Sequence, residues 1–508
     1  MTLYVIGIGG TGAKCLEAVI QVSALGLISR EPVRILFVDA DDTNGNLERT
    51  RNSLRIYQQC HDIFKSNGQE SSWMQTPIVA FDQVWSPFGS SQSNSDLANF
   101  FSYNILKQST PALGNLLDVL YTPQERQANL DVGFRGRPAI GAAVMSQLEL
   151  DDLDQEPWGS FLKQIQSEAA SGQEPKIFLC GSIFGGTGAS GLPTLGRLLH
   201  DRLKTLTIRG RVKIGCLFAL PYFGFTTASG ESPDGVYARS DHFLLNTEAA
   251  LRYYYGTRSW EMFDTVYLIG NQNASQMKKF SIGKKTQCNE SHFVELYAGL
   301  AVRQFLTNRS ESAQKVVLMS RQGAKQLSWN DLPDQESVKA EMTNATRFAC
   351  SWLFNLAQVL EEGKAIGVPT FQKSVVWFSE FFRPRQGWFG SKLTSQGEEL
   401  PEFDAADQQA TIEAINNWCR DYLRWLYELH QCDGDAINLF SEIIFADPDR
   451  KTRLNELSSL IVGDTRDGNR RSQDTVESLT RGLVVGDLSV PNQGTAGLAR
   501  AFYRICRL

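Results

Sequence analysis

One glycine-rich stretch has the residue types of a phosphate-binding loop. Residues 180–191 read CGSIFGGTGASG, after an apolar run at 176–179 and before helical spacing at 192–199. Glycines let the backbone approach a ligand closely, and the first N–H groups of a helix favour an anion. The hydroxyls of Thr187 and Ser190 could add hydrogen bonds. The stretch therefore predicts a phosphate site, although a tight turn without a ligand uses the same glycines.

A second glycine-rich loop lies near the N-terminus. An apolar strand at 3–7 leads into Gly9, Gly10, Thr11 and Gly12, and an amphipathic helix follows. A dinucleotide-binding Rossmann domain opens in the same way. The next predicted strand, at 34–38, ends in Asp39-Ala-Asp41-Asp, and a Rossmann site also uses an acid there to bind a ribose. These residues alone leave two kinds of nucleotide-binding fold open.

A third loop, at 133–141, reads GFRGRPAIG and precedes a predicted helix at 142–150. Arg135 and Arg137 are permanent cations that suit phosphate oxygens. Solvent-facing arginines are the simpler alternative. A Rossmann dehydrogenase has no use for such a loop before a second glycine-rich helix start, so the third loop favours another nucleotide-binding fold.

Together the loops resemble those of the tubulin/FtsZ superfamily. Residues 184–190, FGGTGAS, are similar to its signature Gly-Gly-Gly-Thr-Gly-Ser/Thr-Gly and depart from it at Phe184 and Ala189. Residues 39–41 are similar to its Asn-Thr-Asp loop, and 136–141 resemble the end of its Gly-Ala-Gly-x-x-Pro-x-x-Gly loop. The resemblance extends over residues 1–306. It implies a divergent bacterial tubulin-like protein with a Rossmann-like α/β domain, a parallel sheet and a central core helix.

The resemblance also implies GTP or GDP as ligand, with Mg²⁺ held mainly by phosphate oxygens and water rather than by assigned protein ligands. The residues themselves do not select GTP over ATP. Asn271, after a predicted strand at 263–269, would contact the base and ribose or be a turn residue. Asn289 would contact the base or cap the apolar helix predicted at 289–306. The implied ligand-binding residues are Gly9, Gly10, Thr11, Gly12, Asp39, Asp41, Gly136, Arg137, Pro138, Gly185, Gly186, Thr187, Gly188, Ala189, Ser190, Asn271 and Asn289.

The catalytic residues implied by the resemblance lie in an acidic loop. In the family this loop enters the neighbouring subunit's site, where a carboxylate positions the water that attacks the γ-phosphate. Asn330, Asp331 and Asp334 are the candidates, ahead of a predicted helix at 336–360. Helix-capping aspartates are the alternative. The resemblance thus implies a GTPase that assembles head to tail into filaments. A non-polymerising nucleotide-binding sensor or interaction protein, and a Rossmann NAD(P) oxidoreductase, remain as alternatives.

The chain is long enough, at 508 residues, for more than one core. We expect a nucleotide-binding domain at 1–288, a central helix at 289–306 and a smaller, helix-rich α+β domain with a helical extension at 307–508. Residues 46–130 have the composition of a variable insertion, mostly polar loops with one helix at 97–106. In the last part, 374–378 predicts a strand, and 411–430 and 496–508 predict helices.

The composition limits the kind of partner and the cellular compartment that we expect for this chain. The net charge of −6 argues against a general nucleic-acid binder, and nine scattered cysteines without a CxxC pair favour a reducing compartment. The sequence shows no signal peptide and no apolar run long enough for a membrane span. We therefore expect a cytoplasmic protein. The resemblance implies that its main partner is itself, and the C-terminal half is open to a further protein partner.

Overall fold

The computed structural model describes residues 2–28, 30–65, 72–88, 96–225, 236–272, 274–277, 283–307, 315–321, 326–383, 399–432, 437–441, 456–485 and 493–508. The chain forms two compact units. Unit 1 comprises Met1–Val22, Ile28–Leu54 and Thr76–Arg321. Unit 2 comprises Ser23–Leu27, Arg55–Gln75 and Gln322–Leu508.

Unit 1 is built on a parallel sheet of seven strands in the order β3-β2-β1-β4-β5-β7-β9. The strand order reverses between β1 and β4, which creates a crevice beyond the carboxyl ends of these two strands. The strands are β1 (Leu3–Ile8), β2 (Val33–Val38), β3 (Ile78–Ala80), β4 (Lys176–Ser182), β5 (Lys213–Ala219), β7 (Thr265–Ile269) and β9 (Lys315–Met319). A separate two-stranded pair joins β6 (Phe223–Gly224) to β8 (Ser275–Gln276).

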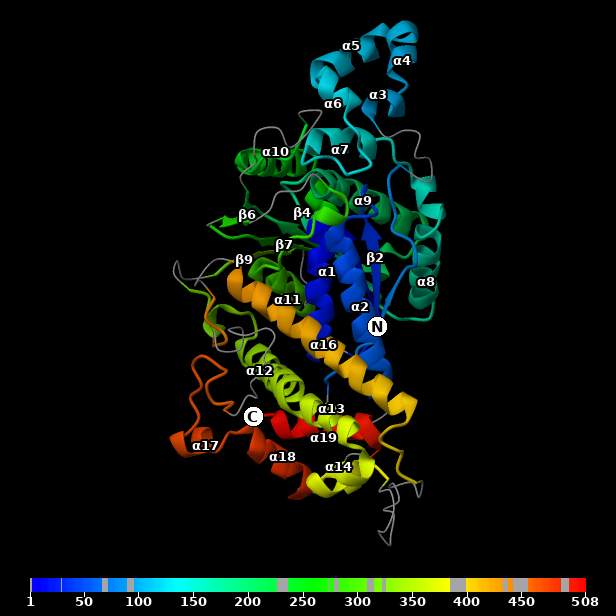
Figure 1. Cartoon of the computed structure of the whole chain (residues 1–508). Coiled ribbons are helices and arrows are strands. Elements are labelled where there is room, and N and C mark those ends of the chain that lie inside the picture. Colours follow the sequence, from blue (N-terminus) through cyan, green and yellow to red (C-terminus); the bar gives the residue numbers. More distant parts are fainter. Residues whose placement is uncertain are drawn as a thin grey trace. The chain divides into compact units, whose positions relative to one another are not determined.

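Helices cover both faces of the sheet (Figure 1). Every residue of β1 and of β4 is buried, as expected for central parallel strands. Tyr4, Ile6 and Ile8 face the core formed with α8 and α9. On the other face a Cβ at Gly7 would overlap Leu16 of α1, and Phe178 packs on Phe305 of α11 with ring centroids 5.4 Å apart. The predicted α/β class with a parallel sheet is confirmed.

The helices that begin before residue 308 connect these strands. The predicted central helix is confirmed as α11, which is buried over most of its length but begins at Phe293 rather than at 289. The bounds are α1 (Gly9–Ala24), α2 (Gly45–Phe64), α3 (Leu97–Phe100), α4 (Tyr103–Ser109), α5 (Pro111–Leu120), α6 (Pro123–Gln127), α7 (Pro138–Met145), α8 (Trp158–Ala170), α9 (Gly186–Thr205), α10 (Phe243–Gly256) and α11 (Phe293–Thr307).

Residues 46–130 hold more regular structure than their polar composition predicts. The expectation of mostly loops is wrong for α2, a helix of 20 residues, and β3 joins the main sheet beside β2. The prediction of loops failed here because the mean hydropathy of α2 is low. The helix is nevertheless packed on the rest of the protein through buried side chains such as Leu47, Leu54 and Tyr57. The helix predicted at 97–106 is interrupted at Ser102, whose φ is +47°, and is completed as α3 and α4.

Unit 2 is helical in its described part, where strand pairing occurs as isolated bridges such as Leu327–Ile437. A π-helical turn at Trp352–Leu356 joins its first two helices. Trp73 stacks on Tyr503 at 4.1 Å, and Trp418 stacks on Tyr422 at 5.3 Å. The helices are α12 (Gln335–Ser351), α13 (Ala357–Ile366), α14 (Val368–Ser374), α15 (Phe378–Phe381), α16 (Ala406–Gln431), α17 (Gly468–Ser472), α18 (Val476–Val485) and α19 (Gly494–Cys506).

The strand predicted at 374–378 is wrong. Ser374 ends α14 and Phe378 begins α15, with a turn between them. Trp377 and Phe378 are buried while Val376 is 77% exposed. The aromatic residues fill a cluster with Phe371 and Phe403. The apolar run therefore encodes the packing of two short helices.

A buried ion pair holds unit 2 together. Arg347, 2% exposed, donates Nη1 to Asp474 Oδ2 at 2.5 Å and Nη2 to Oδ1 at 2.8 Å, and its Nε donates to the Cys506 carbonyl at 2.7 Å. Burial alone would raise the pKa of Asp474, but hydrogen bonds from Arg347 and Arg466 bring that pKa below its usual value.

We expect Asp474→Asn to destabilise unit 2 by about 3 kcal/mol at pH 7, because it leaves a buried guanidinium without its counter-ion. A lowered folded pKa means that the ionised carboxylate stabilises the fold above the ordinary carboxyl pKa and loses this effect as pH falls. The difference between wild type and variant should therefore shrink below about pH 4. Chemical denaturation measures it. Glu477→Gln, which breaks an exposed pair with Arg481, is the control and should change little.

Candidate functional site

A cavity lies beyond the carboxyl ends of β1, β2 and β4, at the point where the strand order reverses. It brings together residues from all three glycine-rich loops and from the acidic end of β2. The predicted residues that line it are Gly9, Gly10, Thr11, Asp39, Asp41, Gly136, Gly185, Gly186, Thr187, Gly188 and Asn289. Segments distant in sequence thus meet where an open α/β sheet binds its ligand.

Two helix N-termini border this cavity. Helix α1 begins at Gly9 and α9 begins at Gly186, with Gly185 as the N-cap residue. Gly9 has φ +73°, and a Cβ built on it would lie 3.3 Å from Thr187 Cβ, so the two loops are in contact. Neither start carries an acidic residue in its first turn. Both starts therefore present backbone donors and a positive dipole end to the cavity.

Several glycines in these loops are needed for packing. A Cβ on Gly12 would lie 2.6 Å from the carbonyl carbon of Gly7, so α1 could not approach β1. A Cβ on Gly186 would lie 2.6 Å from Phe134 Cβ. Gly185 differs, because among the described residues its added Cβ would meet the Ser182 hydroxyl, at 2.9 Å, and no other atom within 4 Å. Gly185 is thus a position at which a side chain could enter the cavity with little damage to the fold, since the Ser182 hydroxyl can turn away.

The two acids after β2 have different roles. Asp41 Oδ1 accepts from Thr43 N and Thr43 Oγ1, and its Oδ2 accepts from Lys284 N at 2.5 Å, so this carboxylate ties two loops together. Asp39 is 3% exposed and its Oδ1 accepts from Asp41 N at 3.2 Å. Its Oδ2 has no hydrogen-bond partner among the described residues. Burial raises the pKa of Asp39 to about 7, while the hydrogen bond from Asp41 N opposes the rise and the charge of the Asp41 carboxylate adds to it.

Four phenylalanines form one wall of the cavity. The ring of Phe184 lies 4.7 Å from that of Phe243 and 5.5 Å from that of Phe223, and Phe225 lies 5.8 Å from Phe243. Phe184 is a position where the signature departs from the superfamily pattern. The open space is about 130 Å³, below the roughly 300–1,000 Å³ of most ligand pockets.

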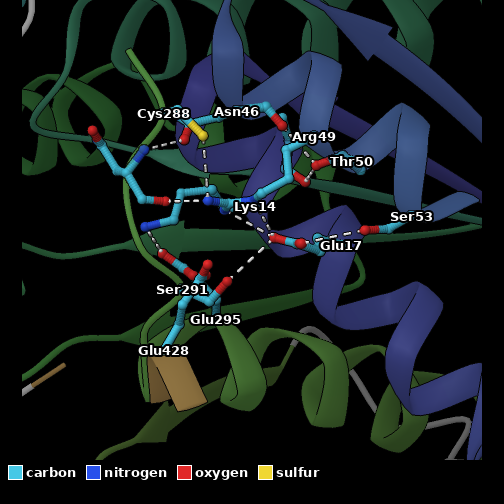
Figure 2. A network of polar contacts seen from close by, with 12 residues as sticks. Lys14, Glu17, Asn46, Arg49, Thr50, Ser53, Cys288, Ser291, Glu295 and Glu428 are labelled. Carbon is cyan, nitrogen blue, oxygen red and sulfur yellow. Dashed lines mark hydrogen bonds and ion pairs between the residues drawn. The ribbon is translucent and has the colours of Figure 1, made fainter. Parts of the chain in front are cut away.

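A polar network positions the opposite wall (Figure 2). Asn289 N donates to Asn46 Oδ1 at 2.7 Å, and the Asn289 carbonyl accepts from Arg49 Nη1 at 2.5 Å. Arg49 pairs with the buried Glu17 at 2.9 Å, and Ser291 Oγ donates to the same carboxylate at 3.2 Å. The network fixes the segment before α11 against α1 and α2, and so holds Asn289 at the cavity.

Asn289 is not the N-cap of the central helix, so that alternative is wrong. The start of α11 is capped instead by His292 and Glu295: Val294 N donates to His292 Nδ1 at 3.1 Å, and His292 N donates to Glu295 Oε2 at 2.8 Å. His292 Nε2 lies 2.8 Å from Ser275 Oγ, and burial lowers the pKa of this imidazole.

Lys14 lines the cavity and was not predicted from the sequence. It is 3% exposed, and its Nζ lies 2.5 Å from Glu295 Oε1. Tyr222 donates to the same oxygen at 2.6 Å. Burial raises the pKa of Glu295, against the opposing effect of Lys14. The available signal was a lysine one turn after a glycine-rich helix start, a position whose side chain points back toward the N-terminus.

Some predicted residues do not line this cavity: Gly12, Arg137, Pro138, Ala189, Ser190 and Asn271. The Ser190 hydroxyl donates within α9, to Gly186 O at 2.8 Å. Arg137, Pro138, Ala189 and Ser190 instead line a groove of about 1130 Å³ beside α7, α9 and α10. Arg135 faces the cavity, but its Nε donates to Asn129 O at 3.0 Å and its Nη1 to Val236 O at 3.1 Å, so it supports the third loop.

No protein-family model and no curated protein sequence matches the chain. The chain is similar to CetZ2 from Haloferax volcanii, solved as a GTPγS-bound protofilament, at 15% identity over 60% of this chain and 59% of that one, with a TM-score of 0.26. Two further solved structures match this chain.

The other two are CetZ from Methanosaeta thermophila strain DSM 6194 and TubZ-Bt in a two-stranded filament. The first has 15% identity over 61% of this chain and 56% of that one, with a TM-score of 0.24. The second has 10% identity over 62% of this chain and 57% of that one, with a TM-score of 0.23. This chain thus spans 56–59% of the length of these tubulin/FtsZ-family proteins, and the likeness assigns no residue of this chain.

The candidate acids of the tubulin/FtsZ resemblance lie in unit 2. Asp331 Oδ2 accepts from Ser328 N at 2.7 Å and from Ser328 Oγ at 2.9 Å, so it closes a capping box. Asp334 is exposed, with φ +51°, at the start of α12, and Asn330 Oδ1 accepts from Gln335 Nε2 at 2.7 Å. Asp334 is therefore the more accessible carboxylate of the two.

The described residues contain no group of three or more His, Cys, Asp or Glu side chains arranged to hold a metal ion. Among the same residues, no helix is both long and apolar enough to cross a bilayer.

Proposed function

We propose that the cavity of unit 1 binds a nucleoside triphosphate, with its phosphates at the N-termini of α1 and α9. The convergence of these two glycine-rich helix starts at the strand-order reversal carries the proposal. The resemblance of the glycine-rich loops to those of the tubulin/FtsZ superfamily implies GTP, whereas the residues themselves do not select guanine over adenine. The residues present fit such a ligand, because backbone donors of two helices face the cavity and the buried Asp39 oxygen lacks a partner among the described residues.

In this proposal different residues contact the phosphates, the ribose and the base of the nucleotide. Thr187 and the backbone at Gly9–Thr11 and Gly185–Gly188 contact the phosphates, Asp39 accepts from a ribose hydroxyl, and Asn289 contacts the base. Mg²⁺, bound with the phosphates and water, neutralises their charge. Stabilisation of developing charge by these fixed donors is what the chain itself contributes to hydrolysis.

Thermal shift measurements with GTP, GDP, ATP and NAD, each with Mg²⁺, test this proposal. A ligand that binds the native state raises the melting temperature. We expect GTP and GDP to stabilise the protein and NAD to have no effect. Stabilisation by NAD(P) without any by GTP would instead establish a Rossmann oxidoreductase, which uses the same switch point. No shift with any nucleotide at millimolar concentration would contradict nucleotide binding.

We further propose that hydrolysis and assembly are linked. A copy of the chain would supply Asp334 to the nucleotide of its neighbour, so contacts would run head to tail and form filaments. In this proposal residues 1–288 with the helix at 289–306 bind the nucleotide, and residues 307–508 form the other face of the contact. The alternative is a non-polymerising nucleotide-binding sensor that lacks this acid.

We expect Asp334→Ala to leave nucleotide affinity unchanged and to lower GTP turnover about 100-fold, the lower end of the usual scale for a general acid–base residue. Asp331→Ala should instead lower the stability of unit 2 by about 1 kcal/mol, because it removes a capping box. Phosphate release at rising protein concentration, with pelleting of the GTPγS-bound protein, measures the first effect. Turnover by Asp334→Ala at the wild-type rate would remove this residue from the proposed mechanism.

A further inference from the structure

Lys14 and Glu295 form a buried ion pair whose lysine faces the cavity. The ammonium has three donors, and within the described part of the chain Glu295 is its acceptor, at 2.5 Å. The remaining near contact is the face of the Tyr222 ring, 5.8 Å from Nζ. Lys14 therefore has hydrogen-bonding capacity left on the side of the cavity.

The glutamate of the pair is fully engaged. Glu295 Oε1 accepts from Tyr222 at 2.6 Å and pairs with Lys14, and Oε2 accepts from His292 N at 2.8 Å. These contacts place the carboxylate in the first turn of α11, where it also caps the helix. The pair thus joins the start of α1, which borders the cavity, to the start of the central helix.

Stability alone is a weak reason for such a pair. Removing two charges from water is costly, and apolar side chains of similar volume often replace a buried ion pair without loss of stability. A lysine held at a cavity bordered by two helix N-termini is, in contrast, well suited to a phosphate, which it meets as a compact charge.

We propose that Lys14 is the phosphate-binding cation of this site and that Glu295 is its positioning residue. This inference rests on the proposed nucleotide binding and adds a specific contact to it. When the phosphates bind, the ammonium is shared between a phosphate oxygen and Glu295 Oε1. Nucleotide occupancy is thereby coupled to the first turn of α11, because the carboxylate that holds Lys14 also caps that helix.

A set of four full-length variants tests the contact, with binding of GTP and of guanosine measured by calorimetry in the presence of Mg²⁺. Lys14→Met alone leaves Glu295 buried without its partner, which destabilises the fold for reasons unrelated to phosphate. The double variant Lys14→Met/Glu295→Gln removes both charges and avoids this. We expect it to bind GTP 10- to 100-fold more weakly than wild type and to bind guanosine equally well, as for loss of one charge-assisted contact.

Glu295→Gln alone keeps the cation and removes its competitor, so GTP affinity should be equal to that of wild type or up to about tenfold tighter, although the protein is less stable. Lys213→Met is the control for loss of a lysine. Lys213 is half exposed and begins β5, at the edge of the sheet away from the cavity. Wild-type GTP affinity in the double variant would show a purely structural pair and overturn the inference. If wild type binds neither GTP nor guanosine, the proposed function itself fails, and the inference fails with it.

Discussion

Replacing Asp39 by asparagine is expected to make the protein more stable at pH 8 by about 4 kcal/mol and to weaken its binding of nucleotide. The folded pKa of Asp39 is about 7 against an ordinary value of 3.8, because the carboxyl is buried beside Asp41. Keeping this group ionised at pH 8 therefore costs the folded state about 4 kcal/mol, at about 1.4 kcal/mol for each unit of pKa. Asparagine has nearly the same shape and no charge.

The pH dependence has a definite sign. A raised folded pKa means that the native state binds the proton more tightly, so this contribution to stability is complete below pH 3.8 and is lost as pH rises toward 7. The advantage of Asp39→Asn should thus be near zero at pH 4 and largest at pH 8, when melting is followed across this range. Nucleotide affinity of wild type should fall about tenfold between pH 8 and pH 6 if the ribose contact requires the carboxylate.

Two neighbours serve as matched controls for the Asp39 variant. Asp42→Asn makes the same chemical change at an exposed position and should change both properties little, because the charge of Asp42 contributes less to the raised pKa of Asp39 than burial does. Asp41→Asn should destabilise the protein, because both of its oxygens accept backbone or hydroxyl hydrogen bonds. An Asp39→Asn protein that is less stable than wild type at pH 8 would show that the carboxylate has a partner in the folded protein.

Gly185→Val is expected to reduce nucleotide affinity at least 100-fold, about 3 kcal/mol, while the protein stays folded. Gly185 caps α9 with φ −90° and ψ 173°, an extended backbone that valine adopts readily. Its side chain would enter the space where the phosphates are proposed to lie, and its near neighbour is the Ser182 hydroxyl. Gly186→Val is less informative, because its Cβ would overlap Phe134 with no ligand present.

Gly210→Val is the control, since a Cβ there meets no atom of the described part of the chain within 4 Å and the residue is exposed. Both variants should melt within a few degrees of wild type, and calorimetry with GTP should separate them. Unchanged GTP affinity in a folded Gly185→Val protein would mean that the α9 loop is a turn without a ligand.

The sequence predicted the frame of this site well, because its signals are local. Apolar runs such as 176–179 become central strands. Glycines at helix starts mark places where the helix backbone packs closely on neighbouring backbone or side chains. Parallel strands end at one edge of the sheet, so the loops after β1, β2 and β4 had to meet.

The sequence could not predict what depends on tertiary contacts. Asp39 and Asp41 look equivalent in the chain. They differ in the structure because the backbone N–H of Lys284, distant in sequence, donates to Asp41 Oδ2. Ser190 has a hydroxyl that could contact a ligand, but this hydroxyl donates to the Gly186 carbonyl within its own helix. Lys14 is held at the cavity by its ion pair with Glu295, and the sequence does not show this contact because Glu295 lies far along the chain, in the first turn of a helix that begins at Phe293.

Hydrogen exchange of the full-length protein with and without Mg²⁺-GTPγS tests the central proposal most directly. The first amides of α1 and α9 have no intrahelical acceptor and should exchange fast in the free protein. Bound phosphates should slow exchange in peptides covering residues 9–12 and 185–188. Protection confined to the groove beside α7, α9 and α10, or no protection in either glycine loop at saturating nucleotide, would contradict a phosphate site between the two helix starts.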